Sequence, residues 1–115
     1  MDERLVKALD ISNYMVTLNN QRRSLKEKFM ADLIFYQNGG SFSVSKELIN
    51  FTKTLVDYDN DTDVVLIDDN NIPILIEDLK EFLSKIINIY FVASNEYYTE
   101  YEKLKKNRSV ERITA

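Results

Sequence analysis

The chain of 115 residues contains no cysteine and no histidine. Without thiols it cannot form disulfides, use a cysteine nucleophile or build the usual Cys and His zinc sites. Without imidazole it lacks the side chain that most often acts as a general base near neutral pH. These absences exclude several enzyme classes. We expect a protein that is not an enzyme, with no catalytic residue and no cofactor.

Glycine and proline are scarce, since the chain has two glycines, Gly39 and Gly40, and one proline, Pro73. So few glycines leave no glycine-rich phosphate loop and no nucleophile elbow. No apolar run approaches the length needed to cross a bilayer, and no secretory leader opens the chain. We therefore expect a soluble cytoplasmic protein with no membrane partner.

The composition is that of one globular domain spanning residues 1–115. The hydrophobic fraction of 44% is sufficient for a core. The net charge of −4 and the pI near 4.8 argue against a protein that coats nucleic acid by charge alone.

Two long helical stretches dominate the pattern. Apolar residues recur at helical spacing over residues 2–38 and again over residues 77–107. At about 1.5 Å per residue each helix would be roughly 45–55 Å long, which is too long for a compact domain of this size. Gly39-Gly40 predicts the stop of the first helix. We expect the two helices to pack antiparallel, with a frayed tail over residues 108–115.

Residues 41–76 predict a small cap between the helices. Ser41–Val44 alternates like a strand, and Ser45 is a candidate N-cap for a helix that ends near Asp57. The fold class is therefore α+β, mostly α, with two or three short strands and one helix in the cap.

The second half of the cap predicts a hairpin of Val64–Asp68 with Ile72–Ile76. Asp69-Asn70 at the turn tolerates positive φ. Pro73 cannot donate to a ladder, so its strand should lie at an edge. Val64–Ile67 is apolar on both faces, which predicts that this strand is covered on both sides or paired centrally.

Five aspartates in this region follow the spacing of a calcium-binding loop, at loop positions one, three, five, seven and twelve. They are Asp57, Asp59, Asp61, Asp63 and Asp68. Thr62 stands where the motif needs glycine, position twelve is a short Asp, and a strand follows instead of a helix. We favour a solvated acidic loop and keep divalent-cation binding as the alternative. Asp68-Asp69 is interpreted as an exposed turn rather than an acid–base pair.

The last helix carries an aromatic band. Its members are Tyr90, Phe91, Tyr97, Tyr98 and Tyr101. One helix face cannot hold both Tyr97 and Tyr98, so one of them must face outward. Tyrosine is favoured at interfaces because it buries a large area with little rotamer loss. The five residues are interface candidates, and packing within one chain is the alternative.

Two basic clusters lie on the helices. They are Arg22, Arg23, Lys26 and Lys28 in the first helix, and Lys103, Lys105, Lys106, Arg108 and Arg112 near the end of the second. Basic residues late in a helix complement its dipole. Because tyrosines lie one turn away from the second cluster, a nucleic-acid-associated accessory factor is the alternative function, not the favoured one.

Four segments resemble small proteins of T4-like marine phages. They are Ser12–Met15, Asn38–Gly40, Val65–Asn70 and Ala93–Tyr98. The resemblance implies a phage origin and a location in the host-cell cytoplasm, with the virion as the alternative; it implies no activity. A two-helix layer leaves apolar surface exposed, which marks partners. We expect a non-enzymatic interaction or structural accessory protein, a homo-oligomer with the dimer favoured, that meets a viral or host protein through its helical surface.

Overall fold

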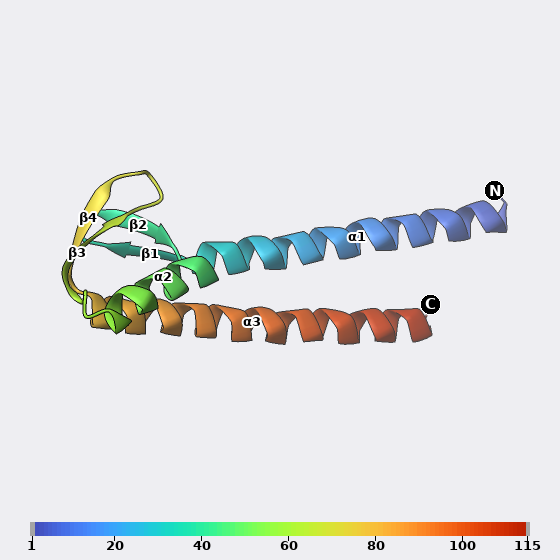
Figure 1. Ribbon diagram of the computed structural model, residues 1–115. Helices are drawn as coiled ribbons and strands as arrows, with labels where there is room; N and C mark the ends of the chain where they lie inside the picture. Colours follow the sequence, from blue (N-terminus) through green and yellow to red (C-terminus); the bar gives the residue numbers. More distant parts are fainter. Residues whose placement is uncertain (1, 115) are drawn as a thin grey trace.

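A computed structural model describes the backbone of residues 2–114 and the side chains of residues 2–107. Three helices and four strands make up this described chain (Figure 1). The helices are α1 (Glu3–Asp32), α2 (Lys46–Asp57) and α3 (Leu79–Thr114). The strands are β1 (Ile34–Gln37), β2 (Gly40–Ser43), β3 (Thr62–Ile67) and β4 (Pro73–Asp78). The predicted class, α+β and mostly α, is confirmed.

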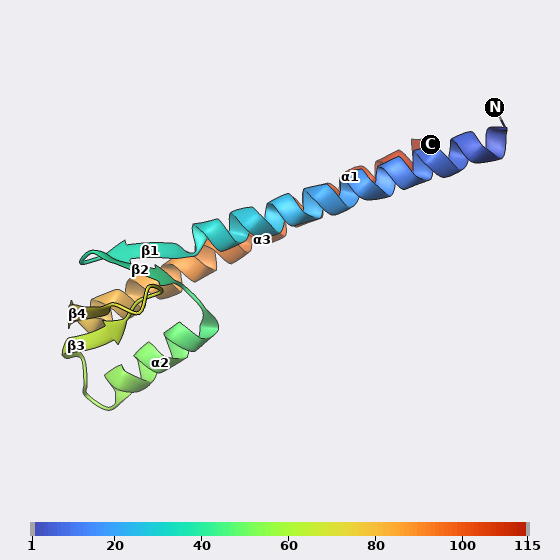
Figure 2. The ribbon, with the colours of Figure 1, turned by 90° about the horizontal axis from the view of Figure 1, so that it is seen from above.

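The molecule is a rod of 70 × 24 × 18 Å. Helices α1 and α3 run antiparallel along its length as a stalk, and the strands and α2 gather at one end as a cap (Figures 1 and 2). The radius of gyration is 21.1 Å, whereas a compact domain of this length would have about 13 Å. The prediction of two long antiparallel helices is therefore confirmed.

The predicted first helix was too long, because α1 ends at Asp32 and the next residues form a strand. Ile34, Phe35 and Tyr36 are β-branched or aromatic and favour strand structure. Asn38 and Gly39 both have positive φ, 52° and 81°, as a two-residue type I′ hairpin turn requires. The glycine pair is therefore part of the β1–β2 hairpin and not a helix stop.

The β3–β4 hairpin is longer at its open end than predicted, and it forms a sheet of its own. Strand β2, at residues 40–43, pairs with β1 and does not join the β3–β4 sheet. The expectation that β3 is covered on both faces was wrong, because Val65 and Ile67 are 56% and 60% exposed. A two-stranded sheet that packs on the molecule with one face leaves its other face open. The positive φ of the turn falls at Asn71.

The helix ends follow local hydrogen bonds. The Ser45 hydroxyl oxygen accepts from the Leu48 amide at 3.1 Å, which confirms the predicted N-cap of α2. Helix α3 begins at Leu79 instead of Glu77, directly after β4, where the Asp78 carboxylate accepts from the Glu81 amide. It runs to Thr114, past residue 107 where the second long helix was expected to end, and no glycine or proline interrupts that stretch. Residue 115 lies outside the described residues.

The core lies where the cap meets the first half of α3. Its buried members are Leu33, Phe42, Val44, Leu66, Ile74, Ile76, Leu79, Phe82, Ile86 and Ala93. Phe82 is fully buried, with ring centroids 5.2 Å from Phe42 and 5.8 Å from Phe35. Gly40 closes the β1–β2 turn against this core, since a Cβ there would lie 2.6 Å from Ile74 Cγ1. The cap is thus anchored on the first half of α3, while the second half of α3 projects beyond this core.

Candidate interaction surface

An aromatic seam joins the two helices of the stalk. The Phe29 ring of α1 lies 4.9 Å from Tyr97 and 6.2 Å from Tyr90, centroid to centroid. Tyr97 continues to Tyr101 at 6.4 Å. Tyr90, Tyr97 and Tyr101 are all half-buried. Three of the five predicted interface residues therefore pack within the chain.

The other two aromatic residues face solvent. Phe91 is 65% and Tyr98 is 67% exposed, and Ile87, four residues before Phe91, is 45% exposed. Residues separated by four and by seven lie on the same side of a helix. Ile87, Phe91 and Tyr98 thus form one apolar row, which we call the outer stripe of α3. As expected, Tyr97 and Tyr98 face in different directions.

An open aromatic groove runs between the outer stripe and α1. Phe29, Ser94, Tyr97, Tyr98 and Tyr101 line it. Ser94 lies between Phe91 and Tyr98 at the spacing of the stripe, so the groove and the stripe form one continuous surface. A small side chain at this position leaves room for an apolar side chain from a partner.

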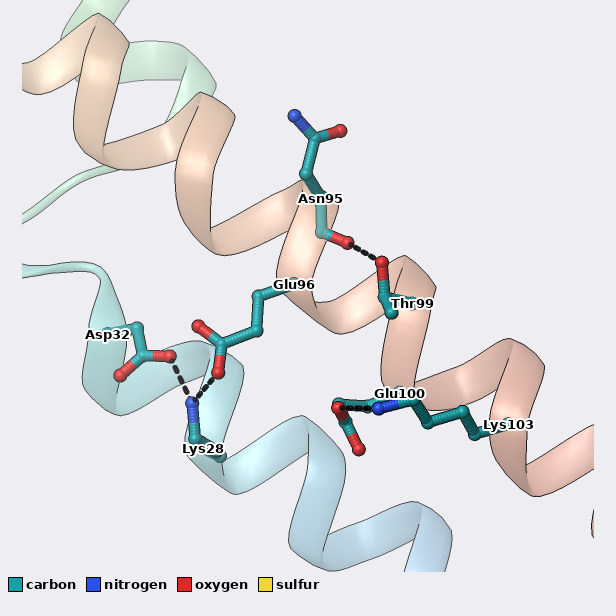
Figure 3. Close-up of polar contacts among 7 residues, drawn as sticks. All are labelled: Lys28, Asp32, Asn95, Glu96, Thr99, Glu100 and Lys103. Atoms are coloured by element: carbon teal, nitrogen blue, oxygen red, sulfur yellow. Dashed lines mark hydrogen bonds and ion pairs between the residues drawn. The ribbon is translucent and has the colours of Figure 1, made fainter.

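The opposite side of the stalk is ionic. Lys28 Nζ of α1 donates to Glu96 Oε1 of α3 at 2.6 Å and to Asp32 Oδ2 at 3.0 Å (Figure 3). The hydrogen bonds to Glu96 and then to Asp32 raise the pKa of Lys28. Glu96 is two residues before Tyr98, which places the two about 200° apart around the helix. One flank of the stalk is therefore polar and the other is aromatic.

Helix α1 carries a second apolar row that the sequence analysis did not identify. Leu5, Leu9 and Val16 are 51%, 47% and 56% exposed. Their separations of four and seven equal those of Ile87, Phe91 and Tyr98. Ser12 and Ser94 occupy the same intermediate position in the two rows. Leu5 and Leu9 belong to the apolar repeat over residues 2–38, and the expectation that this whole repeat packs on the other helix hid their exposure.

The acidic segment does not assemble into a cation site in the described residues, where no group of three or more His, Cys, Asp or Glu side chains could hold a metal ion. Asp61 pairs with Lys80 at 3.2 Å. Asp59 in the loop and Asp63 in β3 have positive φ, so the backbone kinks at both. Asp57 is exposed on the last turn of α2. The five aspartates thus do not converge on a common point.

Asp68 is buried, which corrects its interpretation as an exposed turn residue. Its carboxylate accepts from the backbone amides of Ser41 at 3.0 Å, Asn70 at 2.9 Å and Ile72 at 2.8 Å. These bonds, first those from Ser41 and Ile72, lower the pKa of Asp68 although burial opposes the shift. Asp69 accepts from the Ser43 hydroxyl at 2.7 Å. Both carboxylates thus tie the β3–β4 turn to β2.

The basic residues near the end of α3 are partly neutralised by acidic neighbours. Lys103 pairs with Glu100 at 3.2 Å, and Lys105 pairs with Glu102 at 3.4 Å (Figure 3 shows the first pair). Lys105 Nζ also lies 5.9 Å from the centre of the Tyr101 ring. The side chains of Arg108 and Arg112 lie outside the described part of the chain.

The fold and its surface define an elongated helical hairpin with a β cap, one flank aromatic and one ionic. Comparison of the chain with protein-family models, with curated proteins and with solved structures gave no match. Among the described residues, no helix is both long enough and apolar enough to span a membrane.

Proposed function

We propose that this chain is a non-enzymatic interaction protein that acts as a homodimer. The outer stripe of α3, formed by Ile87, Phe91 and Tyr98, packs against a second copy. The dimer then presents a rigid helical surface to a viral or host protein. The phage origin and the cytoplasmic location stay predictions from the sequence.

The observation that carries this proposal is the size of the exposed surface. The chain exposes 8512 Å², whereas a compact monomer of 13.5 kDa would expose about 6,500 Å². The difference of about 2,000 Å² exceeds the roughly 800 Å² that each partner buries in a standard interface. The apolar side chains of the outer stripe are part of this exposed surface and need cover.

The pattern of the two exposed rows supports a helical partner. Separations of four, three and four residues are those of a coiled-coil seam, and both rows follow them through Ser12 and Ser94. A helical hairpin with a second seam on each helix can pack on another such hairpin as a four-helix bundle. A second copy of the chain supplies matching seams.

A single introduced thiol tests this arrangement, since the natural chain has no cysteine. Ser94→Cys places the thiol in the middle of the outer stripe. Thr99→Cys is the matched control, because Thr99 is exposed and follows Tyr98 by one residue, about 100° around the helix. The measurement is the rate of maleimide labelling at increasing protein concentration.

We expect labelling at position 94 to slow as the dimer forms, while labelling at position 99 stays constant. Labelling at position 94 that is independent of concentration, up to the highest concentration reached, would rule out a dimer through this stripe. Equal slowing at both positions would indicate association without a defined face.

The nucleic-acid alternative stays a prediction. The pairing of Lys103 and Lys105 with glutamates reduces the positive potential near the end of α3. Salt-sensitive binding to single-stranded DNA, lost on neutralising Lys103, Lys105 and Lys106, would favour it over the dimer as the primary role.

A further inference from the structure

One edge of strand β3 has no strand partner in the described chain, and α2 is the next element on that side (Figure 2). Hydrogen-bonded pairs alternate along an antiparallel ladder, and the Asp68 amide bonds the Ile72 carbonyl at 3.0 Å. The backbone groups of Val65 and Ile67 therefore point away from β4. Within the described residues, the backbone N–H and C=O groups of Val65 and Ile67 make no backbone hydrogen bond outside the β3–β4 strand pair. Their side chains are 56% and 60% exposed.

The other edge of the same hairpin is closed. Pro73 has no amide proton to donate. The outward carbonyl of Leu75 accepts from Asn38 Nδ2 at 2.7 Å. Figure 2 shows β4 between β3 and the β1–β2 hairpin, and Ile74 of β4 packs against Gly40. Natural sheets commonly protect their edges with a proline or with a neighbouring segment. The edge of β4 is protected in both ways, whereas the edge of β3 has neither a proline nor a strand beside it.

The segment that carries this edge is acidic, although Lys46 and Lys53 lie on α2 and Lys80 pairs with Asp61. Between Lys53 and Lys80 the chain has no lysine or arginine and eight acidic residues: Asp57, Asp59, Asp61, Asp63, Asp68, Asp69, Glu77 and Asp78. Asp63 lies on β3 two residues before Val65, and its side chain is exposed. Strand β3 therefore carries an exposed acid followed by two exposed apolar side chains, Val65 and Ile67.

We propose that the edge of β3 binds an extended basic segment of another protein, which adds to the β3–β4 hairpin as a third strand. Its backbone bonds the outward groups of Val65 and Ile67. Apolar residues at alternate positions cover these two side chains, and a lysine or arginine meets Asp63. Charge makes a second copy an unfavourable occupant, since it would bring two acidic caps together.

The test uses a fluorescein-labelled peptide, Lys-Thr-Lys-Thr-Val-Thr-Val-Thr, and the same peptide with glutamate in place of lysine. Fluorescence anisotropy measures binding to the full chain at low and high salt. Val65→Pro removes the outward N–H of β3. Leu75→Pro is the matched control, because Leu75 pairs with Val65 and its N–H points to the closed edge. Circular dichroism checks that both variants fold.

We expect the lysine peptide to bind the natural chain and Leu75→Pro alike, with weaker binding at high salt. Val65→Pro should weaken it by about tenfold or more, because hydrogen bonds and apolar contact are lost together. The glutamate peptide should not bind. If Val65→Pro does not fold, Ile67→Lys should also block the edge by repelling the basic probe.

Equal binding of the lysine peptide to Val65→Pro would show general charge attraction and overturn the proposal, as would no binding to the natural chain. A dimer mass that is lost in Val65→Pro would show that a second copy covers the edge, which also contradicts it. The helical dimer is tested separately, since neither proline lies on the stalk.

Discussion

Replacing Phe91 by aspartate puts a charge in the middle of the outer stripe of α3. In the single chain this side chain is 65% exposed, so the substitution removes little packing within the monomer. Aspartate lowers helix propensity by less than about 0.7 kcal/mol. We therefore expect Phe91→Asp to keep its helical circular dichroism and to lose self-association.

The exposed area sets the size of the effect. An aromatic side chain buries roughly 150–250 Å², so 65% exposure leaves about 130 Å² of Phe91 for a partner to cover. At about 25 cal/mol per Å² this is at most about 3 kcal/mol per copy, or about 6 kcal/mol for both copies of a symmetric dimer. We expect the dissociation constant of the dimer to rise by about two to four powers of ten.

Sedimentation equilibrium over a dilution series measures this constant for the natural chain and the variant. Val92→Asp is the control: Val92 is 52% exposed and is turned about 100° from Phe91 around the helix. It should leave the constant within about tenfold of the natural value. A Phe91→Asp variant that associates like the natural chain, or a Val92→Asp variant that dissociates as readily as Phe91→Asp, would refute the assigned stripe.

Two further predictions concern the cap. Phe82→Ala removes a fully buried ring and should lower the free energy of unfolding by about 3–5 kcal/mol in a urea titration; a loss comparable to that of an exposed residue would contradict the core. Because the folded-state pKa of Asp68 is lowered from 3.8, its stabilising contribution is present above pH 3.8 and is lost as the pH falls through the folded-state pKa. Asp68→Asn should therefore lower stability at neutral pH and flatten its acid dependence, and an unchanged acid dependence would show that Asp68 does not contribute.

Long helices were predictable from the sequence because nothing interrupts their apolar repeat. The error at the end of α1 has a local cause: Leu33 and Tyr36 also fit the helical repeat, and they hid the alternation of Ile34–Gln37. Asn38-Gly39 is a strong hairpin signal, but an asparagine and a glycine are also typical of the end of a helix. A helix C-terminus and a hairpin turn both use the positive φ of glycine. Only the pairing of β1 with β2 shows that this glycine lies in a hairpin turn.

The rest depends on contacts between distant segments. A run such as Val64–Ile67 is typical of a strand covered on both sides, and only the two-stranded topology shows that Val65 and Ile67 are exposed. The role of Asp68 depends on Ser41, 27 residues earlier in the chain. Among the aromatic residues, spacing separated Tyr97 from Tyr98, but the direction of each depended on where Phe29 of α1 packs.

The mass of the natural chain in solution tests the central claim most directly. Elution volume alone would mislead, because a rod with a 21.1 Å radius of gyration elutes early even as a monomer. Light scattering over a dilution series gives the mass itself. The dimer predicts twice the single-chain mass of 13.5 kDa at high concentration, falling toward 13.5 kDa on dilution. A mass of 13.5 kDa at every concentration would contradict the account.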